Sequence, residues 1–96
     1  MVTPKKIIEK VAEFYDLREK DILDASRKKE IVKPRQIAMY LLRDQLKCSF
    51  PFIGRKFRGK DHTTAIHSCK KIAFEIENDK KLEEEVNLIR ERVLSS

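Results

Sequence analysis

The chain has 96 residues and a mass of 11.4 kDa. This length leaves room for one hydrophobic core, since domains most often hold about 100–150 residues. Charged residues make up 40% of the chain, and no apolar run approaches the roughly 18 residues that a membrane-spanning helix needs. No secretory signal follows the first methionine, and two cysteines are too few for a disulfide framework. We therefore expect a single domain, residues 1–96, that is cytoplasmic and does not bind membranes.

The net charge of +6 is unevenly distributed along the chain. Residues 25–35 carry +4 and residues 55–74 carry +5, whereas residues 75–96 carry −3. Two separate basic segments favour a polyanionic partner that meets one face of the molecule, because evenly solvated lysines would not segregate in this way.

The scarcity of glycine and proline and the absence of β-branched runs indicate an all-α fold. Thr3 followed by Pro4 is typical of a helix start, and apolar residues recur at helical spacing as far as Phe14 or Tyr15. A short helical turn is predicted over residues 19–24. The apolar periodicity then disappears.

Residues 25–33 are predicted to form a basic loop without apolar anchors, which we expect to be mobile in the free protein. Pro34 is expected to open the next helix in its first turn, where its missing N–H is tolerated, and this helix should end near Lys47.

Two helices joined by a short turn are predicted next, the first over about residues 50–57 with Ser49 as its cap. After a break at residues 58–60, a longer helix is predicted over about residues 62–77. This order of a short helix, a turn and a long helix is typical of a helix-turn-helix. A last amphipathic helix is indicated by four apolar residues at helical spacing, Leu82, Val86, Ile89 and Val93. We therefore predict a compact helical bundle that contains a helix-turn-helix.

Two motifs suggest other chemistry and are rejected. The segment from Gly54 to Asp61 matches a phosphate-binding loop, but Asp61 stands where a Mg²⁺-ligating Ser or Thr is needed and no apolar strand precedes Gly54. His62, His67 and Cys69 lie close in sequence, with Cys48 upstream, but their spacing fits no zinc site. We therefore expect no catalytic site, no metal, no cofactor and no small-molecule substrate in this chain.

The start of the long helix is the best candidate for a functional site. Asp61, His62, Thr63 and Thr64 would occupy the turn from which a recognition helix presents side chains to base edges in the major groove. Asp can accept a hydrogen bond from cytosine, and threonine offers a hydroxyl and a methyl group. The alternative for Asp61 is that it only caps the helix, since Asp is a preferred cap.

Three segments, residues 34–41, 53–57 and 60–72, resemble the C-terminal DNA-binding domain of the DnaA family of bacterial chromosomal replication initiators. The similarity extends from about Val11 to the end of the chain. Two positions depart from the family pattern: Arg58 stands where a glycine or small polar residue is usual, and Phe52 replaces a common acidic residue.

The resemblance implies that the domain binds double-stranded DNA at DnaA boxes in replication origins, as one monomer per box. It implies that Asp61, His62, Thr63 and Thr64 read bases in the major groove and that Arg27 enters the adjacent minor groove. The residues implied to contact the DNA backbone, or to support those contacts, are Arg35, Gln36, Arg43, Pro51, Lys60, His67 and Lys71.

Full-length members of the family carry an ATPase domain, so ATP and Mg²⁺ are expected only there, and this chain is expected to be a domain excised from a longer protein and not an enzyme. Two alternatives stay open at this point. One is a protein-interaction bundle that docks a partner through the apolar stripe of its last helix, and the other is a nonspecific RNA or DNA binder that uses charge alone.

Overall fold

The computed structural model describes residues 1–58 and 60–95, and within these residues it contains helices and no strands. The helices are α1 (Pro4–Phe14), α2 (Glu19–Leu23), α3 (Lys29–Leu46), α4 (Phe50–Lys56), α5 (His62–Asn78) and α6 (Lys80–Ser95). The predicted all-α class is thus confirmed, as is the order of a short helix and a long helix that forms the helix-turn-helix, α4 and α5.

Side-chain caps fix several helix starts where the sequence indicates them. The hydroxyl oxygen of Thr3 accepts from the backbone N–H of Lys6, and Ser49 does the same for Phe52 at the start of α4. Such caps satisfy backbone donors that have no partner inside the helix. Prolines in the first turn of both helices lose nothing, because these positions donate no intrahelical hydrogen bond.

The start of α3 differs from the sequence prediction. We predicted a loop as far as residue 33 and a helix that opens at Pro34, but α3 begins at Lys29 and Pro34 lies inside it. The backbone N–H groups of Ile31 and Val32 already donate to the carbonyl of Lys28. Burial of Ile31 and Pro34 stabilises this earlier turn. Pro34 has no N–H to donate to the carbonyl of Glu30 four residues earlier, and Glu30 is an exposed residue, so this missing hydrogen bond falls on the solvent-facing part of the helix.

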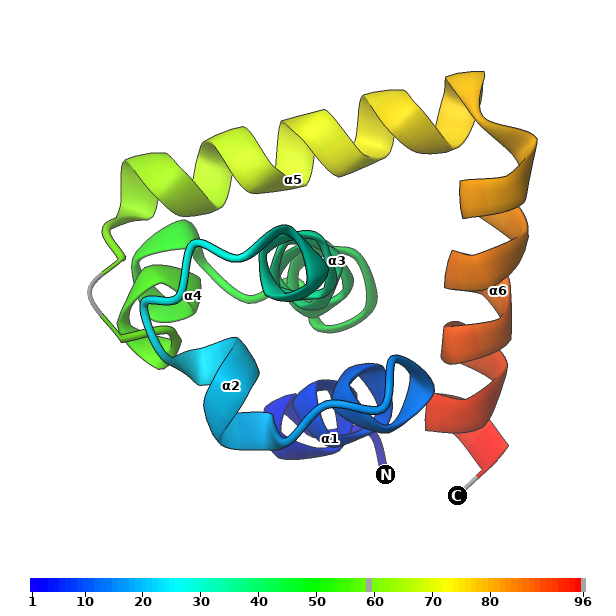
Figure 1. Cartoon of the computed structure of the whole chain (residues 1–96), viewed down its shortest axis with the longest axis horizontal. Helices are drawn as coiled ribbons and strands as arrows, with labels where there is room; N and C mark the ends of the chain where they lie inside the picture. The colour runs from blue at the N-terminus through cyan, green and yellow to red at the C-terminus, as the bar shows by residue number, and fades with distance from the viewer. Residues whose placement is uncertain (59, 96) are drawn as a thin grey trace.

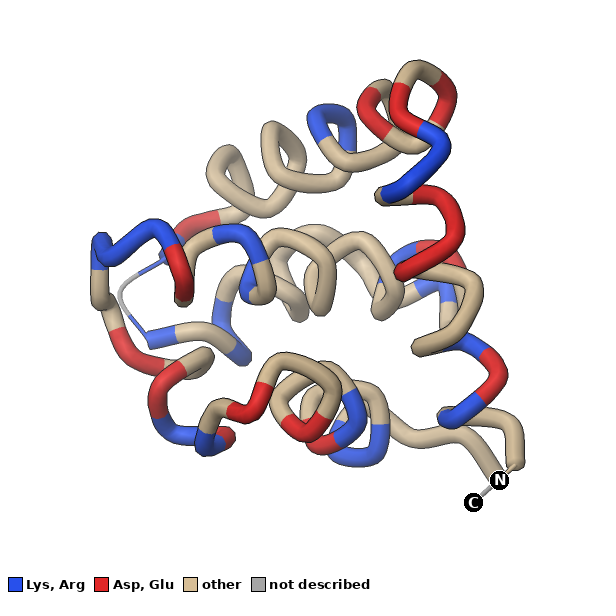
Figure 2. Tube along the Cα trace, turned by 45° about the vertical axis from the view of Figure 1, so that its right-hand side comes forward, with Lys and Arg blue, Asp and Glu red and all other residues tan. Residues whose placement is uncertain are grey.

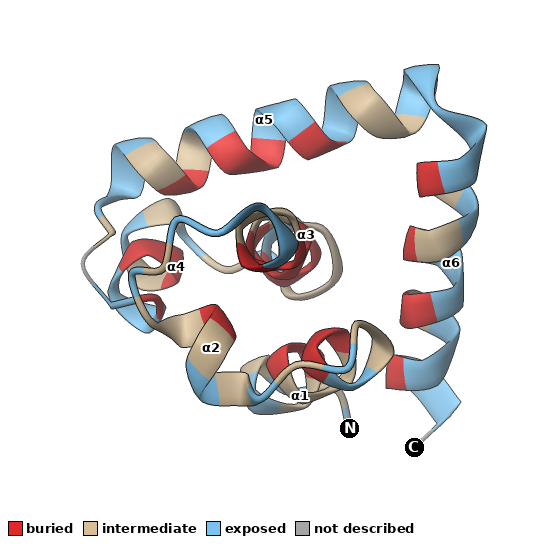
Figure 3. Ribbon diagram, in the orientation of Figure 1, coloured by how far each residue is buried: buried red, intermediate tan, exposed pale blue. Residues whose placement is uncertain are grey.

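α3 lies at the centre of the bundle, with the other helices around it (Figure 1). α5 crosses one side of α3, α1 and α2 lie on the opposite side, and α6 runs from the end of α5 towards α1. The buried residues of every helix face this centre (Figure 3). This packing places one face of α5 on the core and leaves its other face exposed.

The apolar stripe of α6 packs inside the molecule. Leu82, Val86, Ile89 and Val93 are at most 6% exposed, and Figure 3 shows this buried side of α6 turned towards α1 and α3. The stripe is therefore not free to dock a partner, which removes the observation behind the protein-interaction alternative. No helix within residues 1–58 and 60–95 is long and apolar enough to cross a membrane.

Candidate nucleic-acid interface

The helix-turn-helix is held together by a close approach of backbones. A Cβ atom added to Gly54 in α4 would lie 2.8 Å from the carbonyl carbon of Asp61 and 2.9 Å from its oxygen. Real Cβ atoms do not approach backbone so closely, so only glycine lets the start of α5 pack against α4 at this point. Gly54 therefore has a packing role, and the phosphate-loop match is a coincidence of residue types.

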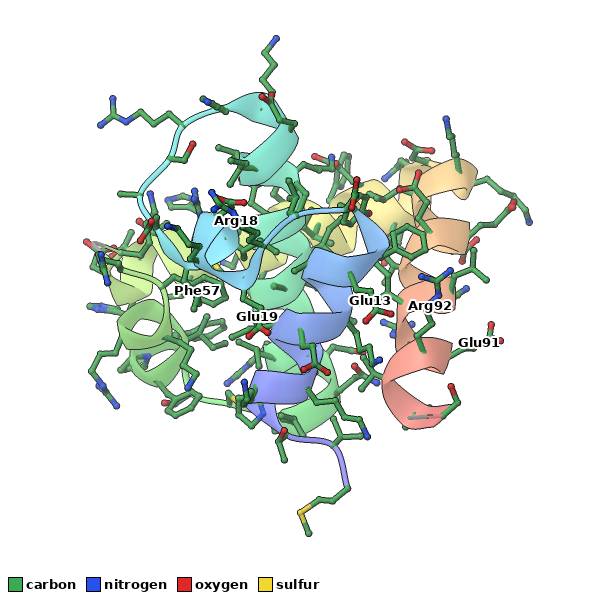
Figure 4. All side chains as sticks on the ribbon, turned by 60° about the horizontal axis from the view of Figure 1, so that its bottom comes forward. Glu13, Arg18, Glu19, Phe57, Glu91 and Arg92 are labelled. Atoms are coloured by element: carbon green, nitrogen blue, oxygen red, sulfur yellow. The ribbon has the colours of Figure 1, made fainter. Side chains whose placement is uncertain are left out.

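The turn between the two helices is anchored at Phe57 and Arg58. Phe57 is fully buried, and Figure 4 shows it between α4 and α2. The backbone N–H of Arg58 donates to the carbonyl of Leu23 at 2.8 Å, and its guanidinium pairs with Asp24 at 3.3 Å. Arg58, which departs from the family pattern, thus ties the turn to α2. Phe52, the other departure, is half-buried and lies 6.0 Å from the ammonium of Lys56.

Asp61 is the N-cap of α5. Its Oδ1 accepts from the backbone N–H of Thr64 at 2.9 Å, and this hydrogen bond lowers the pKa of the carboxyl group. The side chain is nevertheless exposed, as are those of His62 and Thr63, while Thr64 is half-buried. His67 is exposed one turn further along α5. The cap therefore leaves the first turn of α5 free to meet a ligand.

Arg35 organises the loop between α2 and α3. It is only 3% exposed, and its guanidinium donates to the carbonyls of Ile22 at 2.7 Å and Ser26 at 2.8 Å, and also to those of Asp21 and Asp24. Burial lowers the pKa of Arg35, but an arginine still stays charged at neutral pH. Of the two roles expected for Arg35, contact with the DNA backbone or support of such contacts, this arrangement favours support.

The same contacts add an anchor that the sequence did not indicate. The sequence contains no apolar anchor in the loop, and Arg35 provides a polar one from inside α3. The mobility of the loop in the free protein stays a prediction. The loop presents Arg27, whose exposed guanidinium has no hydrogen-bond or ion-pair partner among residues 1–58 and 60–95. The hydrogen bond from Arg35 to the carbonyl of Ser26 thus anchors the backbone next to Arg27, while the side chain of Arg27 points to solvent and can meet a ligand.

Two adjoining hollows bring several predicted contact residues together. One, of about 160 Å³, is lined by residues from the loop, α3 and the start of α5, among them Arg27, Gln36, Lys60 and Thr64. The second, of about 310 Å³, shares Arg27 and Gln36 and adds Lys71. Figure 2 shows lysine and arginine in the loop before α3 and along this side of the bundle, whereas acidic residues gather where α5 meets α6.

Sequence reasoning missed two residues at this surface, Lys33 and Glu75. Glu75 on α5 accepts from Lys71 at 2.6 Å and also from Lys33 on α3, and these hydrogen bonds lower its pKa. The spacing of Lys71 and Glu75, four residues apart on one helix, was a signal for the first pair. The link to Lys33 needs the packing of α3 against α5 and had no sequence signal.

Arg43 and Pro51 lie at a different place from these hollows. The guanidinium of Arg43 stacks on the ring of Phe50 at 4.2 Å and donates to the carbonyl of Cys48 at 2.9 Å. Pro51 is exposed in the first turn of α4. The residues predicted to contact the DNA backbone are therefore not all gathered around these two hollows.

No group of three or more potential metal ligands occurs within residues 1–58 and 60–95. Cys69 is 7% exposed, and burial raises the pKa of its thiol to about 11. A thiol with so high a pKa is a poor nucleophile at neutral pH, so Cys69 acts as a small apolar residue of the core.

The fold and this surface define a helix-turn-helix domain whose second helix is exposed and surrounded by cationic side chains. A family profile described as "Bacterial dnaA protein helix-turn-helix" matches residues 4–72. The chain belongs to this family and corresponds to its C-terminal domain.

Similar proteins agree with this assignment. The chain is 44% identical over 95 residues to the chromosomal replication initiator protein DnaA of Roseiflexus castenholzii, and 42% identical over 91 residues to that of Trichormus variabilis. These matches cover 99% and 95% of the chain but only 20% of each relative, so the ATPase region of the family lies outside this chain. A crystal structure of a DNA replication initiation factor matches with a TM-score of 0.79 and 35% identity, over 94% of this chain and 28% of that one.

Proposed function

We propose that this domain binds double-stranded DNA at DnaA boxes of a bacterial replication origin and so supports the initiation of chromosomal replication. The observation that carries the proposal is the exposed first turn of α5 with Arg27, Gln36, Lys60 and Lys71 around the hollows beside it. Family membership and the titles of the similar proteins support it.

In this proposal the start of α5 enters the major groove. Asp61, His62, Thr63 and Thr64 contact base edges, where donors and acceptors differ for every base pair. Arg27 enters the adjacent minor groove, whose negative potential favours a guanidinium. The position of the domain on the duplex is set by residues that contact the DNA backbone or support such contacts: Gln36, Arg43, Pro51, Lys60, His67 and Lys71, with Arg35 in the supporting role.

The domain would act as a monomer on each box, as one part of a longer cytoplasmic protein. ATP and Mg²⁺ would bind to another part of that protein, and residues 1–96 would supply sequence recognition alone. The binding of DNA by this part needs no cofactor, because hydrogen bonds to bases and ionic contacts to phosphates are all supplied by side chains.

The test is a titration of the domain with a duplex that contains a DnaA box and with a scrambled duplex, each at two salt concentrations. Specific binders prefer their site by about 10³-fold or more. The variants His62→Ala and Thr63→Ala should each lose about 1–3 kcal/mol on the box and little on scrambled DNA. Equal affinity of the unmodified domain for both duplexes would contradict the proposal and would indicate binding by charge alone.

A further inference from the structure

A third hollow lies on the other side of α5 from Arg27. Its volume is about 580 Å³, and it is lined by residues from the second half of α3, the residue after α3, and α5: Tyr40, Arg43, Asp44, Lys47, Cys69, Lys70 and Ala73. Three of these residues are cations: Arg43 on α3, Lys47 directly after α3, and Lys70 on α5. Of the three, only Arg43 is among the residues that the family resemblance implies at the DNA backbone. Lys47 and Lys70 are both exposed.

The charge of this hollow is more positive than its residues first indicate. Its one acidic lining residue, Asp44, accepts from the guanidinium of Arg90 at 2.8 Å. Arg90 belongs to α6 and does not line the hollow, so it neutralises the carboxylate of Asp44 without itself taking part in the surface of the hollow. Within the described residues, the ammonium groups of Lys47 and Lys70 have no ion-pair partner. The hollow therefore presents three cations to solvent.

Local structure fixes the guanidinium of Arg43 and the backbone of Lys47. Arg43 is fixed by the ring of Phe50 and the carbonyl of Cys48. Lys47 follows the last residue of α3 with φ 56° and ψ 32°, the left-handed conformation that favours glycine. Its backbone N–H donates to the carbonyl of Arg43 at 3.0 Å. A lysine at such a position costs stability relative to glycine, and its side chain projects from the end of α3 at a fixed point.

The two cationic regions flank α5 on opposite sides. Lys70 and Lys71 are consecutive on α5 and point about 100° apart, and Lys70 lines this hollow while Lys71 lines the one beside Arg27. On α3, Gln36 and Arg43 are separated by two helical turns, a rise of about 10 Å. A major groove is about 12 Å wide and has one phosphate backbone along each edge. The distance between Gln36 and Arg43 along α3 is thus close to the width of a major groove, so the two residues would lie near opposite edges of a groove that α5 enters.

We propose that Arg43, Lys47 and Lys70 together bind the phosphate backbone of one DNA strand, opposite to the strand that Gln36 and Lys71 contact. This inference rests on the proposed function and adds Lys47 and Lys70 to the DNA contacts. The ligand is the phosphodiester backbone, so these two residues contribute affinity and position but no discrimination between bases.

The first test compares Lys47→Gly, Lys70→Ala and the double variant with the unmodified domain on box and scrambled duplexes across a range of salt. Each single substitution should reduce the magnitude of the log–log salt slope by about 1, and the double variant by about 2. The loss should be similar on both duplexes. Lys80→Ala, which removes an exposed lysine of α6 outside the three hollows, is the control and should leave the slope unchanged.

Lys47→Gly separates binding from folding. Because glycine adopts the left-handed conformation without strain, this variant should keep or raise the thermal midpoint while it weakens DNA binding. Unchanged salt slopes for both single variants would overturn the inference. If the unmodified domain still prefers the box in that experiment, the proposed function stands and only the role of this hollow is wrong.

The second test assigns the strand. Duplexes in which single phosphates are replaced by neutral methylphosphonates report which phosphates the domain needs. Lys70→Ala should abolish the sensitivity at phosphates of one strand, and Lys71→Ala should abolish it at phosphates of the other. Loss of sensitivity on the same strand for both variants would contradict the proposed arrangement.

Discussion

Asp61 combines two roles that substitutions can separate. Asparagine caps a helix as well as aspartate does, but its amide also carries donors, whereas alanine does neither. We expect Asp61→Asn to keep the thermal midpoint and to change which base the box prefers at the contacted position. Asp61→Ala should lower both the midpoint and box affinity. Equal box preference for the asparagine variant and the unmodified domain would show that Asp61 is only a cap.

The cap also has a pH dependence with a defined sign. The hydrogen bond from Thr64 lowers the pKa of Asp61 below its ordinary value. The contribution of this carboxylate to folding is therefore complete above the pKa of the unfolded chain, and it is lost as the pH falls through the lowered pKa. DNA binding at neutral pH is unaffected by this titration.

Arg27 is the second residue whose role can be isolated. The loop around it is anchored by Arg35, so substitution of Arg27 should leave the fold intact. Arg27→Ala should weaken box binding without a change in the thermal midpoint, and Arg27→Lys should weaken it as well, because an ammonium cannot reproduce the planar fork of a guanidinium. Lys28→Ala, a neighbouring exposed cation, is the control. Similar losses for all three variants would contradict a specific minor-groove role.

At the scale of elements, the contact between α4 and α5 should be sensitive to a single methyl group. Gly54→Ala would place a Cβ 2.8 Å from the backbone of Asp61, so the start of α5 must shift. Overpacking of this kind costs about 1–3 kcal/mol. We expect a lower thermal midpoint and, at a temperature where the variant is folded, a reduced preference for the box over scrambled DNA. A lower midpoint with an unchanged preference would show that α5 keeps its place on DNA.

The sequence predicted elements whose signals are local. Thr3, Ser49 and Asp61 cap helices where their side chains indicate a start, and the apolar spacing of α6 corresponds to its buried face. The start of α3 was missed because its first turn, Lys-Glu-Ile-Val-Lys, carries one buried residue among charged ones and a proline follows.

Tertiary contacts explain what the sequence could not show at the site. The four backbone carbonyls that Arg35 binds belong to residues 21–26, and no pattern in the chain links a buried arginine to them. The bridge from Glu75 to Lys33 likewise exists only because α3 packs against α5. The family resemblance thus implied which residues contact DNA, but it did not indicate the hydrogen bonds and ion pairs that hold those residues in position.

At the scale of the whole molecule, α6 contacts both α3 and the C-terminal end of α1. Tyr15 donates to Glu85 at 3.0 Å, and Arg90 donates to the hydroxyl of Tyr40 at 3.1 Å. Figure 4 shows Arg92 of α6 beside α1, where its guanidinium stacks on the ring of Phe14 at 4.9 Å. None of these residues belongs to the proposed base-reading set. These contacts assign α6 to the scaffold, where it stabilises the packing of α1 and α3.

This division between scaffold and interface predicts different effects for two neighbouring residues of α6. Ile89 is fully buried and Leu88 is 48% exposed. Ile89→Ala should destabilise the domain by about 2–5 kcal/mol because it leaves a cavity in the core, and each kcal/mol lowers the thermal midpoint of a domain of this size by about 4–8 °C. Leu88→Ala is the matched control and should shift the midpoint little. At a temperature where Ile89→Ala is folded, its preference for the box over scrambled DNA should equal that of the unmodified domain, since α6 contributes no contact to bases. A preference that falls for the folded Ile89→Ala variant would mean that α6 sets the geometry of recognition as well as the stability of the fold.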